Sequence, residues 1–335
     1  MSTEKFIFRL DELGKEHNDL VGKKSANLGE LTNAGFRVPP GFALSLAAYE
    51  EFIKTAGVMD EIREYFAEFK ADPNDPKDLR KYVDSSKEVR RLVESKAMPK
   101  NIEDSVALYY DELCEKTGMS NVAVSTRSAG STSHPGQYET YLGVAGALHV
   151  MTNIIRVWSS TFNTRSIIAR ARMGLPLEYD PIGVCVLKMV DAKAAGVMFT
   201  AEPNTADASK VVIEGTWGLG ESVVSGAVAP DTWVVDKASY KITDCRLSPT
   251  TAGNGMTSET GSPSSTEHAH GGRKGCLTDE EVVGLVKIGE KIERHFGSPQ
   301  DIEWAIDGER DQDQDNIVLL QTRPEKFRLE INFAF

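Results

Sequence analysis

The stretch from residue 301 to residue 323 constrains the fold of this chain more than any other. Apolar and other residues alternate in it, first around Trp304 and then around Leu320, with a polar, acidic segment between the two runs. Alternation with a period of two is typical of β-strands, and two such runs joined by a turn predict a hairpin. The pattern predicts that Ile302, Trp304 and Ile306 face away from Asp301, Glu303 and Ala305, and that Val318 and Leu320 face away from Leu319, Gln321 and Arg323.

Four polar side chains of this hairpin predict a site for a metal-bound nucleotide. Asp301 and Glu303 share one strand face, as do Gln321 and Arg323, so antiparallel pairing would gather them on one surface. Carboxylate and amide oxygens are the ligands that Mg²⁺ prefers, and a guanidinium suits a phosphate. The alternative is a solvated strand face. The apolar residues around Trp304 speak against it because they predict that one side of the strands is buried.

Composition and charge exclude several classes of function. The chain has 335 residues, a net charge of −12 and four cysteines. An acidic balance argues against nucleic acid or an anionic membrane as the main partner. The cysteines lie far apart without a CxxC pair, so neither a zinc site nor a disulfide framework is indicated. Without a signal peptide or an apolar run of membrane-spanning length, a cytoplasmic protein of one or two domains is expected.

Two segments of the first half predict phosphate binding. Gly22 and the lysines after it open a helix that ends near Gly35, and a helix N-terminus with a lysine attracts phosphate. Further on, a strand at 122–126 delivers Arg127 into a loop rich in Ser, Thr and Gly. Exposed lysines and a plain hairpin with a polar loop are the respective alternatives. His134 is interpreted as a loop residue rather than a catalytic histidine.

Other segments predict structure rather than chemistry. Residues 153–176 form an amphipathic helix or helix pair with a basic face. A β-rich half begins near residue 181, residues 249–275 are of low complexity and expected to be mobile, and Thr278 with Glu281 makes a capping box. The basic face comprises Arg156, Arg165, Arg170 and Arg172.

Six stretches, in order, resemble the nucleotide-binding domain of the phosphoenolpyruvate synthase / pyruvate phosphate dikinase family. They are VGKKSANLGEL, STRS with GQYETYLGV, STFNTRSIIAR, AAGVMFT, GLGESVVSGAVAPD, and PQDIEWAIDG with LLQTRPE. The resemblance implies an α/β (α+β) ATP-grasp fold with ATP in the cleft between two subdomains. The expected ranges are 1–180, with a lid loop at 130–136, then 181–325, and a tail at 326–335.

The resemblance also implies a role for individual residues. Lys24, Arg127 and Arg323 match the cations that bind phosphate and take part in catalysis. Glu303 and Gln321 match the ligands of Mg²⁺. Asp301 matches a supporting acid, and the backbone of an adenine hinge falls on Leu187, Lys188, Met189 and Val190.

The implied reaction is the splitting of ATP to AMP and phosphate, with the β-phosphoryl group passed to a histidine. No segment resembles the family's swivelling phosphohistidine domain, so a partner subunit carrying one is expected. In this respect the chain resembles the ATP-binding subunit of phenylphosphate synthase, where phenol is the acceptor. Part of a phosphoenolpyruvate synthase or a rifampicin phosphotransferase would look similar. A non-catalytic nucleotide sensor and a ligase that forms ADP remain alternatives.

Overall fold

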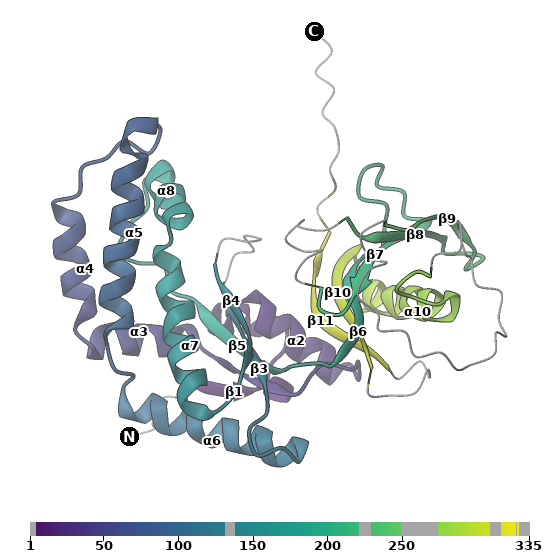
Figure 1. Cartoon of the computed structure of the whole chain (residues 1–335), viewed down its shortest axis with the longest axis horizontal. Coiled ribbons are helices and arrows are strands. Elements are labelled where there is room, and N and C mark those ends of the chain that lie inside the picture. Colours follow the sequence, from purple (N-terminus) through teal and green to yellow (C-terminus); the bar gives the residue numbers. More distant parts are fainter. Residues whose placement is uncertain are drawn as a thin grey trace, which may run out of the picture. The chain divides into compact units, whose positions relative to one another are not determined.

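The structure is a computed structural model of the whole chain. It describes residues 5–130, 138–220, 229–248, 274–308, 316–325 and 327, so the predicted lid loop, His134 and the low-complexity segment lie almost wholly outside the described residues. The chain forms two compact units, which are described separately (Figure 1). Unit 1 comprises Met1–Gly35 and Pro39–Met189, and unit 2 comprises Phe36–Val38 and Val190–Phe335.

Unit 1 is built on a five-stranded antiparallel sheet with the strand order β1-β2-β5-β3-β4. Its strands are β1 (Ile7–Arg9), β2 (Gly41–Leu44), β3 (Val124–Ala129), β4 (Thr140–Val144) and β5 (Gly183–Lys188). Its helices are α1 (Asn18–Val21), α2 (Lys23–Asn33), α3 (Leu46–Thr55), α4 (Val58–Ala67), α5 (Leu79–Glu94), α6 (Lys100–Thr117), α7 (Ala147–Ser159) and α8 (Thr164–Met173).

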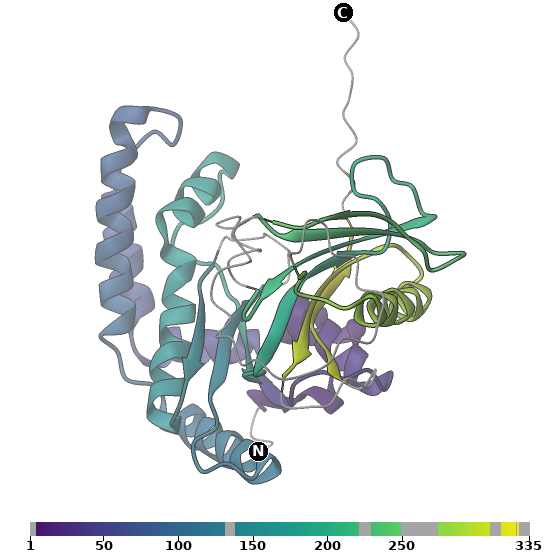
Figure 2. The ribbon, with the colours of Figure 1, turned by 45° about the vertical axis from the view of Figure 1, so that its right-hand side comes forward.

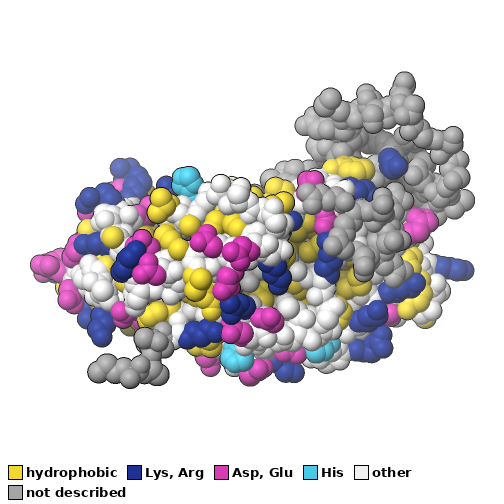
Figure 3. Space-filling view, turned by 90° about the horizontal axis from the view of Figure 1, so that it is seen from below, with side chains coloured by type: hydrophobic (Ala, Val, Ile, Leu, Met, Phe, Trp, Pro, Cys, Tyr) yellow, Lys and Arg dark blue, Asp and Glu magenta, His cyan; other side chains and the backbone are white. Residues whose placement is uncertain are grey.

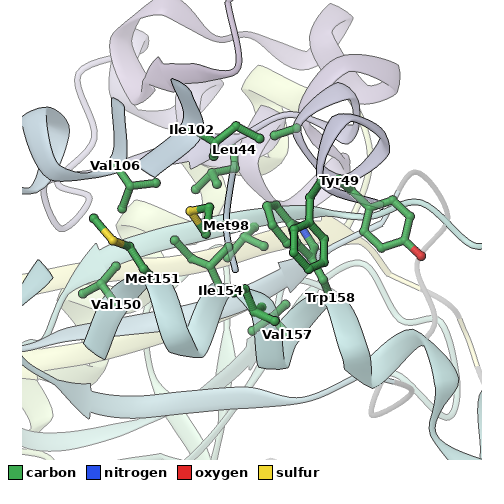
Figure 4. Close-up of a cluster of buried hydrophobic side chains, with 14 of the residues drawn as sticks. Leu44, Tyr49, Met98, Ile102, Val106, Val150, Met151, Ile154, Val157 and Trp158 are labelled. Atoms are coloured by element: carbon green, nitrogen blue, oxygen red, sulfur yellow. The ribbon is translucent and has the colours of Figure 1, made fainter. Parts of the chain in front are cut away.

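The core of unit 1 lies between this sheet and its helices, and α7 is its central helix. Trp158 of α7 is fully buried, with Phe52 stacked on it at 5.0 Å between ring centroids and Tyr49 against its edge at 6.1 Å. Ile154, one turn earlier, points into the same cluster (Figure 4). The apolar stripe predicted for this helix is therefore confirmed, and it fixes the helices on which β3 and β4 rest.

Unit 2 is a six-stranded antiparallel sheet with the strand order β11-β10-β6-β7-β8-β9. Figure 2 shows these strands side by side, with α10 along the sheet, where it packs on β6 and β10. The elements are β6 (Ala192–Phe199), β7 (Lys210–Trp217), β8 (Asp231–Asp236), β9 (Ile242–Arg246), α10 (Asp279–Phe296), β10 (Gln300–Asp307) and β11 (Ile317–Pro324). The predicted mixed α/β class is confirmed.

The helix α10 begins and ends where the sequence predicts. Thr278 accepts a hydrogen bond from the Glu281 amide, and the Glu281 carboxylate accepts one from the Thr278 amide, which completes the capping box. Gly297 ends the helix in the left-handed conformation with φ +72°. This helix leads directly into β10, so it fixes the start of the hairpin that carries the predicted metal ligands.

Two expectations about organisation are corrected. The units divide at Met189 and not at residue 180, because β5 pairs with β2 and β3 and so belongs to unit 1. Arg170 does not lie on an exposed basic face: it is 4 % exposed, and its guanidinium donates to the Asp180 carboxylate at 2.6 Å and to the Thr161 carbonyl at 2.8 Å. A buried arginine of this kind holds the end of α8 and is not available to an acidic partner.

A single buried carboxylate holds the two chain segments that flank residues 249–273. Asp231, at the start of β8, is fully buried. One of its oxygens accepts a hydrogen bond from the Ser248 amide at 2.8 Å, and the other accepts one from the Cys276 amide at 3.0 Å. Both segments are thereby fixed to the same strand.

The surface charge is mixed on the face that Figure 3 shows. Lys and Arg side chains are interspersed there with Asp and Glu side chains. None of the helices in the described ranges has the length and apolar character needed to span a membrane. A phosphate ligand would therefore depend on particular cations rather than on a broad positive field.

Candidate functional site

The predicted hairpin is confirmed, and its register brings the four predicted polar residues into two direct pairs. In the antiparallel ladder of β10 and β11, Asp301 lies opposite Arg323 and Glu303 lies opposite Gln321. Residues directly opposite each other share a face of the sheet. β10 also pairs with β6 on its other side, so the strand that carries the two acids is held along both edges.

A β-bulge lies on the turn side of these two pairs, and strict alternation did not predict it. The register shifts next to Glu303, so that Leu320 is one residue more on β11 than β10 can pair. Leu319 is opposite Trp304 and therefore shares the apolar face, not the face of Gln321 as the alternation predicted. The pairs Glu303–Gln321 and Asp301–Arg323 themselves keep a regular register, and the bulge changes the face of the residues between Leu320 and the turn.

Asp301 and Arg323 form an ion pair that orients the arginine. The Arg323 Nε donates to Asp301 Oδ2 at 2.8 Å, and a terminal guanidinium nitrogen approaches the same oxygen to 2.6 Å. Burial raises the pKa of the Asp301 carboxyl, the Arg323 guanidinium opposes that shift, and the nearby Glu303 carboxylate adds to it. The arginine thus has one fixed direction at the end of the strand.

Glu303 and Gln321 offer a carboxylate and an amide oxygen on one sheet face, which fits a magnesium ion bound to phosphates. Mg²⁺ usually takes one or two protein oxygens and completes six-fold coordination with water and phosphate oxygens. Within the described ranges no cluster of three or more His, Cys, Asp or Glu residues could hold a metal by itself.

In unit 1 the start of α2 is fixed against β3 by a glycine. Gly22 has φ +78°, and a Cβ on it would lie 1.9 Å from the backbone oxygen of Ala129. The Lys23 amide donates to the Gly130 carbonyl at 2.9 Å. Only a residue without a side chain allows this approach, so Gly22 sets where the lysines begin.

Lys24 and Arg127 lie close to the same buried atom. α2 packs on β3 and β5, and Arg127 is opposite Cys185 in the ladder of these strands. Burial raises the pKa of the Cys185 thiol, and the charges of Arg127 and Lys24 act against that shift. Ser25 beside them is fully buried, and its hydroxyl has no hydrogen bond of normal geometry. Lys24 at the start of α2 and Arg127 on β3 thus both act on the Cys185 thiol.

Arg127 belongs to a strand and not to a loop. β3 runs on to Ala129, two residues beyond Arg127, and Arg127 is flanked by Cys185 of β5 and Thr140 of β4. The sequence predicted that the strand ends at Thr126. A central strand position gives the arginine a fixed origin, which a loop would not.

The backbone of the predicted adenine hinge is partly occupied by the fold itself. The Lys188 amide donates to the Pro40 carbonyl at 2.9 Å, and the Met189 amide donates to the Ala123 carbonyl at 2.8 Å. An adenine at this edge would have to use other backbone groups of Leu187 to Val190. The hinge assignment stays a prediction with fewer donors than the sequence suggested.

Glu325 is a half-buried acid at the end of the hairpin that the sequence did not single out. Burial raises its pKa to about 7, the nearby acids Asp301, Glu202 and Glu293 add to the shift, and a hydrogen bond from the Ala201 amide opposes it. One carboxylate oxygen is buried without a partner. The only signal in the sequence is its place after Arg323 and Pro324, which does not reveal burial.

A separate pocket holds none of these residues. It has a volume of about 530 Å³, and its lining residues come from α4, α5 and the turn after α4. They are Glu61, Glu64, Tyr65, Glu68, Phe69 and Leu92. Three carboxylates and no cation line this pocket, so it does not suit a phosphate ligand.

The chain is similar to one protein family and to several proteins named as phosphoenolpyruvate synthases. Residues 18–332 match the family model described as the pyruvate phosphate dikinase AMP/ATP-binding domain. The chain is 37 % identical to a probable phosphoenolpyruvate synthase of Methanothermobacter thermautotrophicus, over 96 % of this chain and 46 % of that protein. A relative from Methanocaldococcus jannaschii is also 37 % identical, over 26 % of its length, and the phosphoenolpyruvate synthase of Pyrococcus furiosus is 35 % identical, over 44 %. The chain thus spans less than half the length of these relatives.

Proposed function

This chain belongs to the pyruvate phosphate dikinase AMP/ATP-binding domain family, and from that premise we propose that it binds magnesium-ATP and passes the β-phosphoryl group to a histidine of another domain or subunit. The observation that carries the proposal is the hairpin register, which pairs Glu303 with Gln321 and Asp301 with Arg323. That register supports the proposal because it brings two oxygen donors and an oriented guanidinium to one face of the sheet, at ladder positions two residues apart.

Each unit has cations that suit the phosphate groups of a nucleotide. Lys24 contributes a point charge at a helix start, where the backbone dipole also favours an anion. Arg127 and Arg323 present forked donors that suit phosphate oxygens. Asp301 keeps Arg323 in one orientation, so little side-chain freedom is lost when phosphate binds.

Glu303 and Gln321 would hold the magnesium ion. When bound, such an ion neutralises charge on the phosphate oxygens during transfer. The chain's own residues supply the remaining work, which is positioning of the phosphates and electrostatic stabilisation in a site with little water.

The proposed overall step conserves atoms and charge. The bond between the β-phosphorus and the α,β-bridging oxygen of ATP breaks, and AMP leaves with that oxygen. The bond between the γ-phosphorus and the β,γ-bridging oxygen also breaks, and water takes the γ-phosphoryl group as orthophosphate. The protons of the attacking water and of the histidine nitrogen go to solvent. A bond forms between a histidine nitrogen and the β-phosphorus. The histidine belongs to a domain or subunit that presents a phosphohistidine domain.

The proposal has two versions, which differ in the final acceptor of the phosphoryl group. The names of the relatives describe phosphoenolpyruvate synthases, which supports pyruvate as the acceptor. The resemblance to the ATP-binding subunit of phenylphosphate synthase supports phenol instead. Supplying each acceptor together with a histidine-bearing partner separates these versions, because only the true acceptor removes the phosphoryl label.

The direct test measures nucleotide binding and product formation. We expect calorimetric titration to show binding of ATP with Mg²⁺ that weakens at least 10-fold when Mg²⁺ is chelated or when Glu303 is replaced by Ala. Glu115→Ala, an exposed acid of α6, serves as the matched control and should bind like the parent chain. With a histidine-bearing partner, ATP labelled at the β-phosphate should yield AMP and an acid-labile label on the partner.

The two other functions give different products. ADP in place of AMP would identify an acyl-phosphate-forming ligase. Binding of ATP that is unaffected by Glu303→Ala and releases no AMP with any partner would identify a nucleotide sensor. Either result would reject the proposed phosphotransfer.

A further inference from the structure

Residues Phe36–Val38 form a strap, a three-residue segment that leaves unit 1 and packs with unit 2. They lie between α2 and β2 in the sequence, yet they belong to the compact unit of β10, β11 and α10. The chain therefore passes between the units after Gly35, again before Pro39, and once more after Met189. The helix that carries Lys24 is joined to unit 2 by only a few residues.

Three contacts fasten the strap to unit 2. The Arg37 carbonyl accepts a hydrogen bond from the Leu319 amide of β11 at 2.9 Å. The Arg37 guanidinium forms an ion pair with the Asp307 carboxylate at the end of β10, and these side chains are 31 % and 12 % exposed. The Phe36 ring meets the His295 ring of α10 edge to face, with 6.4 Å between centroids.

These contacts lie close in sequence to the predicted ligands. Leu319 precedes Gln321 by two residues, with only the bulge residue between them. Asp307 is the last residue of β10, the strand that also contains Asp301 and Glu303. The strap is thus attached to both strands of the hairpin. Any change in its attachment acts first on the strands that carry the metal ligands.

The two ends of the strap differ in stiffness. Gly35 has φ +80°, with no atom within 4 Å of the position that a Cβ would take, so the chain can turn there without steric contact. Pro39 and Pro40 have restricted φ and no amide hydrogen, and the Pro40 carbonyl accepts a hydrogen bond from the Lys188 amide of β5. The backbone of the strap is therefore less restrained at Gly35, next to α2, than at Pro39 and Pro40.

We propose that Arg37 and Asp307 are positioning residues of the nucleotide site, which hold the strap against β10 and β11 and so keep Glu303 and Gln321 in place for the metal-bound nucleotide. This inference rests on the proposed function. A partly exposed ion pair contributes too little to decide whether a unit folds. A displacement of about 1 Å far from the reacting atoms, in contrast, can reduce a rate by about 100-fold. The pair is thus expected to matter for binding and not for folding.

The experiment compares variants of the full chain by Mg·ATP titration, thermal unfolding and hydrogen exchange. Arg37→Ala should weaken Mg·ATP binding by about 10-fold, speed exchange of the Leu319 amide and leave the melting temperature nearly unchanged. Arg37→Lys, which keeps the charge, should restore most of the affinity. The reversed pair Arg37→Asp with Asp307→Arg should bind more tightly than either single change. Arg80→Ala, which removes an exposed ion pair with Asp84, is the matched control and should have no effect.

Three results would overturn the inference. The first is normal Mg·ATP affinity in Arg37→Ala. The second is a loss of affinity that follows the melting temperature and is not restored by Arg37→Lys or by the reversed pair. The third is a parent chain that binds no Mg·ATP, which rejects the proposed function as well. If Glu303→Ala loses affinity while Arg37→Ala does not, only the role of the strap fails.

Discussion

The start of α2 and the β10–β11 hairpin each present groups suited to phosphate, but they fix those groups by different means. At the start of α2 the position depends on one glycine, because only Gly22 allows the helix to approach Ala129 so closely. In the hairpin the positions depend on how many residues separate the paired groups along each strand, because the two-residue spacing keeps Gln321 and Arg323 on the face of Asp301 and Glu303. The first arrangement is sensitive to side-chain volume, and the second to chain length.

The largest effect is expected from deleting one residue of β11. Removing Thr322 would place Arg323 opposite Ile302, on the other face from Asp301. The variant should lose AMP formation by on the order of 1,000-fold or more, since an arginine and its partner are both misplaced. Deleting Leu320 is the matched control: it removes the bulge but keeps Glu303 opposite Gln321. Quantifying AMP by chromatography separates the variants, and equal losses in both would contradict the dependence on register.

Removing one cation of the hairpin should cost less than changing its register. Arg323→Ala takes one phosphate donor away and leaves Asp301 without its guanidinium. AMP formation should fall about 100-fold, or about 3 kcal/mol in transition-state stabilisation, while the fold persists. Rates measured at saturating Mg·ATP and circular dichroism check the two parts. Turnover close to that of the parent chain would remove Arg323 from the site.

The start of α2 should be sensitive to the volume of the side chain at position 22. Gly22→Ala places a methyl group against the Ala129 backbone oxygen at a positive φ, and unit 1 should lose about 2–3 kcal/mol in free energy of unfolding. Gly57→Ala has a similar φ of +67° but open space around the new Cβ, so it should lose only about 1 kcal/mol. Denaturant unfolding measures both. Similar losses in the two variants would mean that close packing at Gly22 contributes nothing beyond backbone strain.

The smallest effect is expected in the pH dependence of stability, through Glu325 at the end of the hairpin. The folded protein binds the Glu325 proton more tightly than the unfolded chain, because the pKa is raised from 4.5 to about 7. The stability contributed by that proton therefore falls as pH rises from about 4.5 to about 7. Glu325→Gln should be more stable than the parent chain by about 1 kcal/mol at pH 8, a figure reduced for partial exposure, and equal to it near pH 4. Parallel pH profiles in thermal unfolding would contradict this assignment.

The local structure could be predicted from the sequence, but the long-range pairing of strands and side chains could not. The alternation around Trp304 and the glycine–lysine start of α2 were enough to predict a hairpin and a helix, because both signals are local. The bulge at Leu320 left no signal, since an extra residue in a strand does not change its composition. Arg170 looked exposed because its partner Asp180 lies in the loop after the helix, and nothing local specifies that pair.

The site could be predicted only as a set of residue types. Arg127 was assigned to a loop because Ser128 and Ala129 suit either loop or strand, and pairing with β5 decided the matter. The same pairing moved β5 into unit 1. Carboxylates, amides and cations are visible in a sequence; the register that places them on one face depends on the whole sheet.

The buried carboxylate of Asp231 has a consequence for how this fold can vary. Since Ser248 and Cys276 are both tied to it, the polypeptide that runs between them starts and finishes at one anchored point of the sheet. Residues added to or removed from the segment between Ser248 and Cys276 would not alter the register of β8 or the start of α10. Natural variants and engineered insertions should therefore be tolerated there, whereas replacing Asp231 would loosen both ends together.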